Sequence, residues 1–289
     1  MTFVASAGTI AAVTINDSNA LDLKALTTTG NLTVTAGGAV TDSGTLVIPG
    51  TATISASGQA VTLDESSNNF GTLAITGANV AVTDTNAIIL GASTISGTYT
   101  LTAGGAVTDT GALAITGVTT IAAGSGNNIT LDHTSNNFQA AVIITSGNNV
   151  TLVDAGAIDL GASTVAGTYA VTATASGDIT DSGVLAITGG ATFTVANGRS
   201  ITLDQSSTFS STVTFVASAG TIAAVTINDS NALDLKALTT TGNLTVTAGG
   251  AVTDSGTLVI PGTATISASG QAVTLDESSN NFGTLAITG

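Results

Sequence analysis

Aspartate has the clearest potential for chemistry in this sequence, because it recurs at one place in a repeating pattern. If successive repeats stack, these aspartates would line up in a row, which we call the carboxylate file. Neighbouring carboxylates in the file would repel each other by about 1 kcal/mol per pair at a water-like dielectric. Backbone N–H groups, raised pKa values or bound cations would have to offset that repulsion. The twelve residues, out of 18 acidic side chains, are Asp17, Asp42, Asp64, Asp84, Asp109, Asp132, Asp154, Asp181, Asp204, Asp229, Asp254 and Asp276.

Two interpretations of these aspartates remain open. In one, the eleven from Asp42 to Asp276 are candidate ligands of a Ca²⁺-binding edge. In the other, each aspartate caps a corner as an Asx-turn, in which the carboxylate accepts the backbone N–H two residues on. The calcium signature GGxGxDxUx of repeat β-rolls is absent. Asp64 directly follows Leu63, whereas Asp42 stands two residues after Val40, so the file is expected to be staggered.

Other side chains that could do chemistry favour structural roles. His133 is the only histidine, and Gln205 occupies its place in the next repeat, which argues against a required base or ligand. The Asn-Asn-Phe corner, as in Asn68-Asn69-Phe70, predicts left-handed turns with stacked amides and an inward phenylalanine. A glycosidase would need a unique cleft lined by aromatic residues. With no tryptophan and two tyrosines, we expect no enzyme and no catalytic or cofactor-binding residue.

The charge balance limits the possible partners. The formal charge is −15, with only three Lys and Arg residues, so a basic patch for nucleic acid or anionic membrane cannot form. There is no cysteine, hence no disulfide and no thiolate metal site. No signal peptide is visible, and no apolar run approaches the roughly 18–20 residues of a membrane helix.

The chain is built from repeats. Residues 214–289 repeat residues 2–77 without a substitution, and two identical copies cannot each hold a private catalytic pocket. Diverged units fill the remainder, so that we divide one continuous domain, 1–289, into repeat units 9–78, 79–148, 149–220 and 221–289.

The pattern within each unit predicts an all-β fold. Apolar residues alternate with threonine, as in 99–102 (YTLT), and Gly, Asn, Asp and Ser clusters interrupt the strands. Asn197-Gly198 is the only two-residue signal for a hairpin, whereas like residues recur at like places in successive segments. This favours a single-stranded parallel β-helix, a β-solenoid, with about three short strands per coil of ~20–30 residues and about twelve coils.

The segments GALAITGVTTIAAG and AVTDSGTLVIPGTATISASGQAVTLD resemble the repeat regions of giant bacterial surface proteins, the filamentous haemagglutinin-like adhesins and autotransporter passengers. The resemblance covers the whole chain and lies in composition and repeat style. It implies a right-handed β-helix, export through an outer-membrane pore, and a place outside the cell or on its surface. It transfers no functional residue, since stalk repeats have none.

These observations predict a structural repeat segment of an extracellular adhesin or filament, acting as a rigid stalk or a self-associating fibre. The expected partner is the chain itself, end to end or within a longer array of the same repeat. The alternatives are an adhesion module that binds Ca²⁺ or cell-surface glycans, and a β-helix enzyme acting on polysaccharides. No cofactor is expected unless the aspartates bind Ca²⁺.

Overall fold

A computed structural model describes residues 10–175 and 177–288 of the chain. The chain divides into two compact units, residues 1–140 and 141–289. Both units are parallel β-solenoids, and the described residues contain strands but no helix. The predicted all-β parallel β-helix is therefore confirmed.

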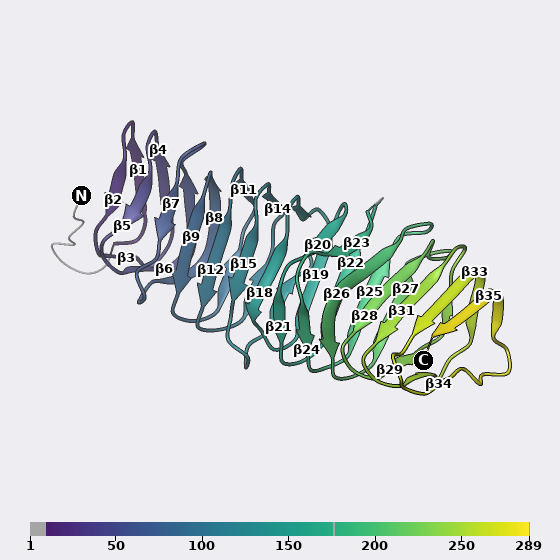
Figure 1. Cartoon of the computed structure of the whole chain (residues 1–289). Helices are drawn as coiled ribbons and strands as arrows, with labels where there is room; N and C mark the ends of the chain where they lie inside the picture. The colour runs from purple at the N-terminus through teal and green to yellow at the C-terminus, as the bar shows by residue number, and fades with distance from the viewer. Residues whose placement is uncertain (1–9, 176, 289) are drawn as a thin grey trace. The chain divides into compact units, whose positions relative to one another are not determined.

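The first unit winds strands of successive turns side by side (Figure 1). Val13 pairs with Leu32, Leu21 with Val40, and Leu26 with Leu46, so one turn of the chain carries three strands. The strands of this unit are β1 (Val13–Asp17), β2 (Leu21–Leu23), β3 (Leu26–Thr27), β4 (Leu32–Ala36), β5 (Val40–Asp42), β6 (Leu46–Ser55), β7 (Val61–Leu63), β8 (Asn69–Gly77), β9 (Val80–Asp84), β10 (Ile88–Leu90), β11 (Ser93–Ile95), β12 (Tyr99–Ala103), β13 (Val107–Asp109), β14 (Leu113–Ile115), β15 (Thr119–Ala122), β16 (Ile129–Leu131) and β17 (Asn137–Phe138).

The second unit has the same parallel register, for example Val225 with Leu244 and Leu244 with Ala264. Its strands are β18 (Val142–Ser146), β19 (Val150–Asp154), β20 (Ile158–Leu160), β21 (Ser163–Val165), β22 (Tyr169–Ala173), β23 (Ile179–Asp181), β24 (Leu185–Ile187), β25 (Ala191–Val195), β26 (Ile201–Phe209), β27 (Val213–Ala217), β28 (Val225–Asp229), β29 (Leu233–Leu235), β30 (Leu238–Thr239), β31 (Leu244–Ala248), β32 (Val252–Asp254), β33 (Leu258–Ser267), β34 (Val273–Thr274) and β35 (Asn281–Thr288).

The length of a turn varies within the units. It is short where Thr72 pairs with Ile89 and longer where Ile201 pairs with Val225. Because many turns are shorter than the predicted ~20–30 residues, the two units together make about 14 turns, close to the predicted twelve.

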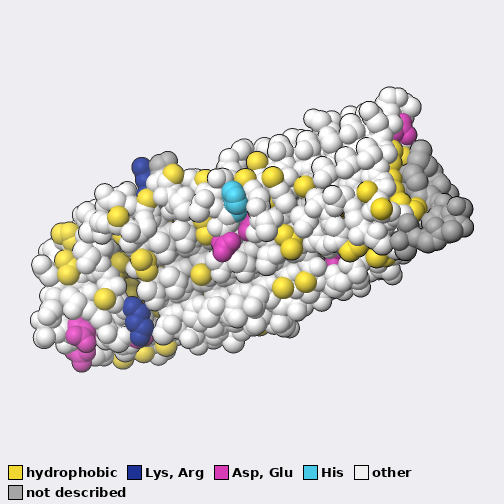
Figure 2. Space-filling model, turned by 180° about the vertical axis from the view of Figure 1, so that it is seen from behind, with side chains coloured by type: hydrophobic (Ala, Val, Ile, Leu, Met, Phe, Trp, Pro, Cys, Tyr) yellow, Lys and Arg dark blue, Asp and Glu magenta, His cyan; other side chains and the backbone are white. Residues whose placement is uncertain are grey.

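Alternation of side chains sorts the sequence into interior and surface. In β4, Leu32, Val34 and Ala36 are buried, while Thr33 and Thr35 are exposed. β-branched and apolar residues fill the interior because successive strand residues point to opposite faces. The face in Figure 2 carries scattered charged and apolar groups among uncharged polar ones. No helix of the described residues is long and apolar enough to cross a membrane.

The interior of the second unit contains an aromatic cluster around Phe193. Its ring centroid lies 6.1 Å from that of Tyr169, 6.2 Å from that of Phe209 and 6.1 Å from that of Phe215. The Tyr169 and Phe209 rings meet it edge to face, the arrangement that aromatic quadrupoles favour. Phe193 is fully buried, so it is a central packing element of its turn.

Candidate functional site

The aspartates do not form one continuous file. The ladder partner of Asp17 is Ala36, that of Asp42 is Leu23, and that of Asp84 is Ala103. The predicted stagger occurs between some consecutive turns, as where the N–H of Asp64 donates to Asp42. The file is interrupted where the spacing of the aspartates does not match the turn: one turn on from Asp17 the chain has reached only Ala36, and Asp42 comes later. The structure instead divides eleven of the twelve residues into three sets, each with its own hydrogen bonds, and the twelfth, Asp181, is a variant of the second set.

The first set caps corners by Asx-turns. Each carboxylate accepts the backbone N–H two residues on, at 2.6–3.0 Å, as the second sequence interpretation proposed. Two of them also accept an N–H from the preceding turn: Phe70 N lies 2.6 Å from Asp84 Oδ2, and Phe209 N lies 3.3 Å from Asp229 Oδ1. The members of this set are Asp17, Asp84, Asp154 and Asp229.

The second set forms what we call the amide clamp, a motif that ties consecutive turns together. Asp42 Oδ1 accepts the N–H of Asp64 at 3.0 Å, and Asp42 Oδ2 accepts the side-chain amide of Asn68 at 2.5 Å. Asn68 Oδ1 in turn accepts the N–H of Leu46 at 2.8 Å. The same triad of Asp, Asn and Leu recurs as Asp109, Asn136 and Leu113, and as Asp254, Asn280 and Leu258.

The third set supplies the backbone N–H groups of the second. The N–H groups of Asp64, Asp132 and Asp276 donate to Asp42, Asp109 and Asp254, and that of Asp204 donates to Asp181. Their own side chains point to solvent. Backbone N–H groups therefore offset the carboxylate charge at many of these corners, one of the three solutions expected from the sequence.

Burial also perturbs several of these carboxyl groups. It raises the pKa of Asp42, and the amide of Asn68 opposes that rise. Burial likewise raises the pKa of Asp84 against the N–H groups of Phe70 and Asn86, and the pKa of Asp229 against those of Asn231 and Phe209. The polar atoms of these corners are mostly engaged in holding the chain together.

The Asn-Asn-Phe corner differs in part from its prediction. Phe70 and Phe138 are buried, as expected. No described residue other than glycine has a positive φ, however, so the predicted left-handed asparagines are absent from that part of the chain. Asn68 is buried and its amide bonds Asp42 and Leu46, rather than stacking on another asparagine, because the buried carboxylate is the stronger acceptor.

His133 lies in the loop after β16. Its Nδ1 atom accepts the backbone N–H of Ser135 at 3.2 Å, and the backbone N of His133 donates to Asp109 Oδ2 at 3.4 Å. These contacts shape the loop next to an amide clamp and give the imidazole no nucleophile to activate.

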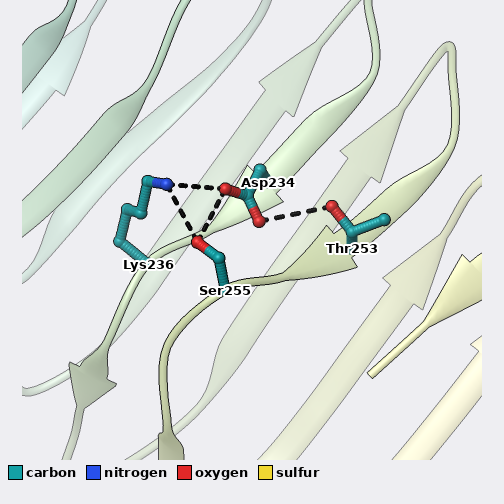
Figure 3. Close-up of polar contacts among 4 residues, drawn as sticks. All are labelled: Asp234, Lys236, Thr253 and Ser255. Carbon is teal, nitrogen blue, oxygen red and sulfur yellow. Dashed lines mark hydrogen bonds and ion pairs between the residues drawn. The ribbon is translucent and has the colours of Figure 1, made fainter. Parts of the chain in front are cut away.

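A polar cluster surrounds Asp234 on the surface of the second unit, and its side chains face one another in Figure 3. Lys236 Nζ lies 2.7 Å from Asp234 Oδ2 and 2.9 Å from Ser255 Oγ. Ser255 Oγ donates to the same Asp234 oxygen at 2.7 Å, and Thr253 Oγ1 donates to the other at 3.2 Å. Burial raises the pKa of Asp234, but the hydrogen bonds from Lys236 and Ser255 outweigh it, so that the pKa is lowered overall.

The identical first copy repeats the aspartate, lysine and serine contacts of this cluster. Lys24 Nζ contacts both Asp22 and Ser43, and the Ser43 hydroxyl donates to Asp22 at 2.9 Å. The hydrogen bond from Lys24 lowers the pKa of Asp22. Because the serine belongs to the next turn, the cluster joins two turns at an exposed edge.

A groove of about 440 Å³ adjoins the Asp234 cluster. One wall consists of three hydroxyl residues after β26, and the other includes an amide and a carboxylate one turn on. Its polar rim residues are Ser210, Ser211, Thr212, Asn231 and Asp234.

Among the described residues, no group of three His, Cys, Asp or Glu side chains gathers as a metal site would require.

A further set of corners was missed by the sequence analysis. A single asparagine side chain accepts a backbone N–H of the following turn at 2.9–3.0 Å in each of these corners. The signal was present in the sequence at four of the five corners, as an asparagine directly before a strand-like segment. The donors are Thr51, Thr98, Thr168, Thr221 and Thr263, and their acceptors are Asn31, Asn79, Asn149, Asn197 and Asn243.

Turns of parallel strands, closed by recurring Asp and Asn corners, define a repeat protein of the β-solenoid class. The chain matches the family described as Repeats of unknown function (DUF5649), and it belongs to that family. Neither a curated protein nor a solved structure matches the chain. The matched residues are 10–76, 77–145, 147–216 and 222–289.

Proposed function

We propose that this chain is a structural repeat segment of an extracellular bacterial adhesin or filament, acting as a rigid stalk or a self-associating fibre. The observation that carries the proposal is that the two identical copies form the same hydrogen bonds between turns. Asn68 and Asn280 make the same clamp, each with its amide 2.5 Å from the aspartate and its Oδ1 2.8 Å from a leucine N–H. Polar side chains that bridge turns in both copies suit a part that is lengthened by repetition.

The same observation argues against catalysis. A catalytic group needs a free polar atom facing a substrate. Both carboxylate oxygens of Asp42, Asp84 and Asp109 instead accept backbone or side-chain N–H groups. The extracellular location rests on the resemblance to surface adhesins and on the absence of cysteine.

The proposed partner is another turn of the same repeat. In the first copy the next turn covers Leu73 and Ile75, which are 1% and 2% exposed. The same residues in the second copy, Leu285 and Ile287, are 43% and 49% exposed. A further copy of the repeat, in the same chain or in a second molecule, would cover them by the strand pairing that β8 makes with β10 and β11.

Sedimentation of three chains tests whether a further copy of the repeat covers this edge. The 289-residue chain is expected to self-associate with rising concentration, and Leu285→Asp is expected to reduce that association. A chain extended by the sequence of residues 78–148 after Gly289 would cover β35 itself and should associate less. Equal association of all three chains would refute the proposed partner.

Surface display tests the stalk itself. Chains with one, two or three copies of residues 9–220 would carry a terminal tag on a bacterial surface. We expect the distance from the membrane to the tag to rise by a constant increment per copy, because each turn contacts only its neighbours. A distance that does not change with copy number would refute the stalk.

A second candidate function is adhesion to glycans, favoured by the groove beside Asp234. Its hydroxyl, amide and carboxylate groups are those that bind sugar hydroxyls. Titration with neutral polysaccharides, with and without Ca²⁺, tests it. Asp159 is the control, because it also accepts a serine hydroxyl but does not line the groove. Loss of binding in Asp234→Asn, with binding retained in Asp159→Asn, would support adhesion. No heat of binding by the parent chain would exclude this candidate for those polysaccharides.

A further inference from the structure

One member of the clamp set departs from the others. Asp181 occupies the clamp place, and its Oδ1 accepts the N–H of Asp204 at 2.8 Å. The place of the clamp asparagine is taken by Ser207, whose Oγ accepts the N–H of Leu185 at 2.9 Å. Serine thus replaces the acceptor function of the asparagine but not its amide donor.

The missing donor leaves one oxygen of Asp181 without a partner. Asp181 is 7% exposed, and no described group donates to its buried Oδ2 atom. In the three complete clamps the corresponding oxygen accepts an amide at 2.5–2.6 Å. The segment from Asp204 to Phe209 is also shorter by one residue than the segment from Asp64 to Phe70, which follows the donor of a complete clamp. A lone buried carboxylate oxygen carries a large desolvation cost as an anion.

The neighbours of Asp181 do not supply a compensating charge. On the strand before it, Asp159 pairs with Thr180, and on the strand after it Asp204 adds a second negative charge. Asp178 precedes β23 on the same turn, and Asp229 pairs with Ser207 one turn further on. The cation Arg199 lies two residues before Ile201, the first residue of β26. The titratable groups around Asp181 are therefore acidic.

We propose that Asp181 is a proton-binding site, at which the buried and unpartnered Oδ2 takes up one proton and the second unit is thereby stabilised. Only the O–H bond forms, and the proton comes from solvent. Burial raises the pKa of Asp181 to about 6, in agreement with this geometry. Relative to the ordinary value of 3.8, the site binds a proton about a hundred-fold more tightly.

The direction of the pH effect follows from linkage. Because the folded carboxyl binds its proton more tightly than the unfolded one, this group favours folding most at low pH. Its contribution is lost as the pH rises from about 4 to about 6 and stays lost above that. Asp181→Asn fixes the neutral form. It keeps the acceptor for Asp204 and places an NH₂ group where no donor faces it.

Asp109→Asn is the matched control. At that corner both carboxylate oxygens accept N–H groups, from Asp132 and from Asn136. An asparagine would present its NH₂ group to one of these donors in either orientation. Asp109→Asn should therefore lower the melting temperature at every pH, whereas Asp181→Asn should raise it at pH 7.5 and leave it unchanged at pH 4.5.

The direct measurement is a ¹³C NMR titration of the Asp181 carboxyl in the parent chain. The expected midpoint lies near pH 6, and Ser207→Asn, which restores an amide, should lower it. A parent midpoint below pH 4.5 would overturn the proposal. So would a loss of melting temperature at pH 7.5 in Asp181→Asn as large as that in Asp109→Asn. The titration of the parent chain needs no variant to fold.

Discussion

Asn68 Nδ2 lies 2.5 Å from Asp42 Oδ2, although the two residues belong to different turns of the chain. The amide satisfies a buried carboxylate while its own oxygen accepts the N–H of Leu46, so one side chain joins two turns. Asn68 is 0% exposed, and water cannot replace these bonds without opening the corner.

We expect Asn68→Ala to lower the free energy of unfolding by about 3 kcal/mol, because it leaves a buried carboxylate oxygen and a buried N–H without partners. Asn69→Ala is the matched control, since Asn69 is only half-buried, and it should cost less than about 1 kcal/mol. Urea unfolding measures both, and hydrogen exchange at Leu46 gives the local effect. Equal losses of unfolding free energy in the two variants would show that the bonds of the amide clamp do not stabilise the fold.

The sequence predicts the solenoid more fully than it predicts the corners. The alternation of Leu32, Val34 and Ala36 with threonine is a local pattern, so the sequence predicts the strands and the interior. Which aspartate faces which asparagine depends on turn length. The turn that begins at Asp17 places Ala36, not Asp42, beside it, and no local rule gives the length of that turn.

The Lys236 ion pair should act on the titration of Asp234 more than on stability. The pair is about one third exposed, with side-chain exposures of 34% and 36%. Lys236→Met removes a charged donor, so the pKa of Asp234 should rise toward its ordinary value. A lowered pKa stabilises the fold above the unfolded pKa near 3.8, and this contribution is lost as the pH falls through the folded pKa.

A ¹³C titration of the Asp234 carboxyl checks this prediction. Lys24→Met, in the identical first copy, is the control and should shift Asp22 without moving Asp234. High salt should reduce the shift in the parent chain. An Asp234 midpoint that is the same in Lys236→Met and in the parent chain would show that the lysine is not its main partner.

Phe193 should be among the most costly interior residues to truncate. Its ring is fully buried between Tyr169, Phe209 and Phe215, so Phe193→Ala leaves a cavity and should cost about 3–5 kcal/mol. Phe193→Leu keeps most of the volume and should cost less than half as much. Thermal and urea unfolding measure both variants. A loss of less than about 1 kcal/mol in Phe193→Ala would mean that the cluster is loosely packed.

Three glycines separate backbone conformation from close packing. Gly126 has open space around it and no positive φ, so Gly126→Ala should leave stability unchanged or raise it slightly by restricting the unfolded chain. Gly58 has equal space but a φ of 72°, and Gly58→Ala should cost about 1 kcal/mol of backbone strain. At Gly104 a Cβ would run into the carbonyl oxygen of Thr85 in the preceding turn, so Gly104→Ala should cost about 3 kcal/mol.

The order of the three losses, measured by urea unfolding, is the test. The expected order gives the largest loss of stability to Gly104→Ala, because Gly104 has an ordinary φ but packs directly against the Thr85 carbonyl group. If Gly58→Ala proved more destabilising than Gly104→Ala, left-handed backbone geometry rather than the close approach of turns would limit which residues these corners accept.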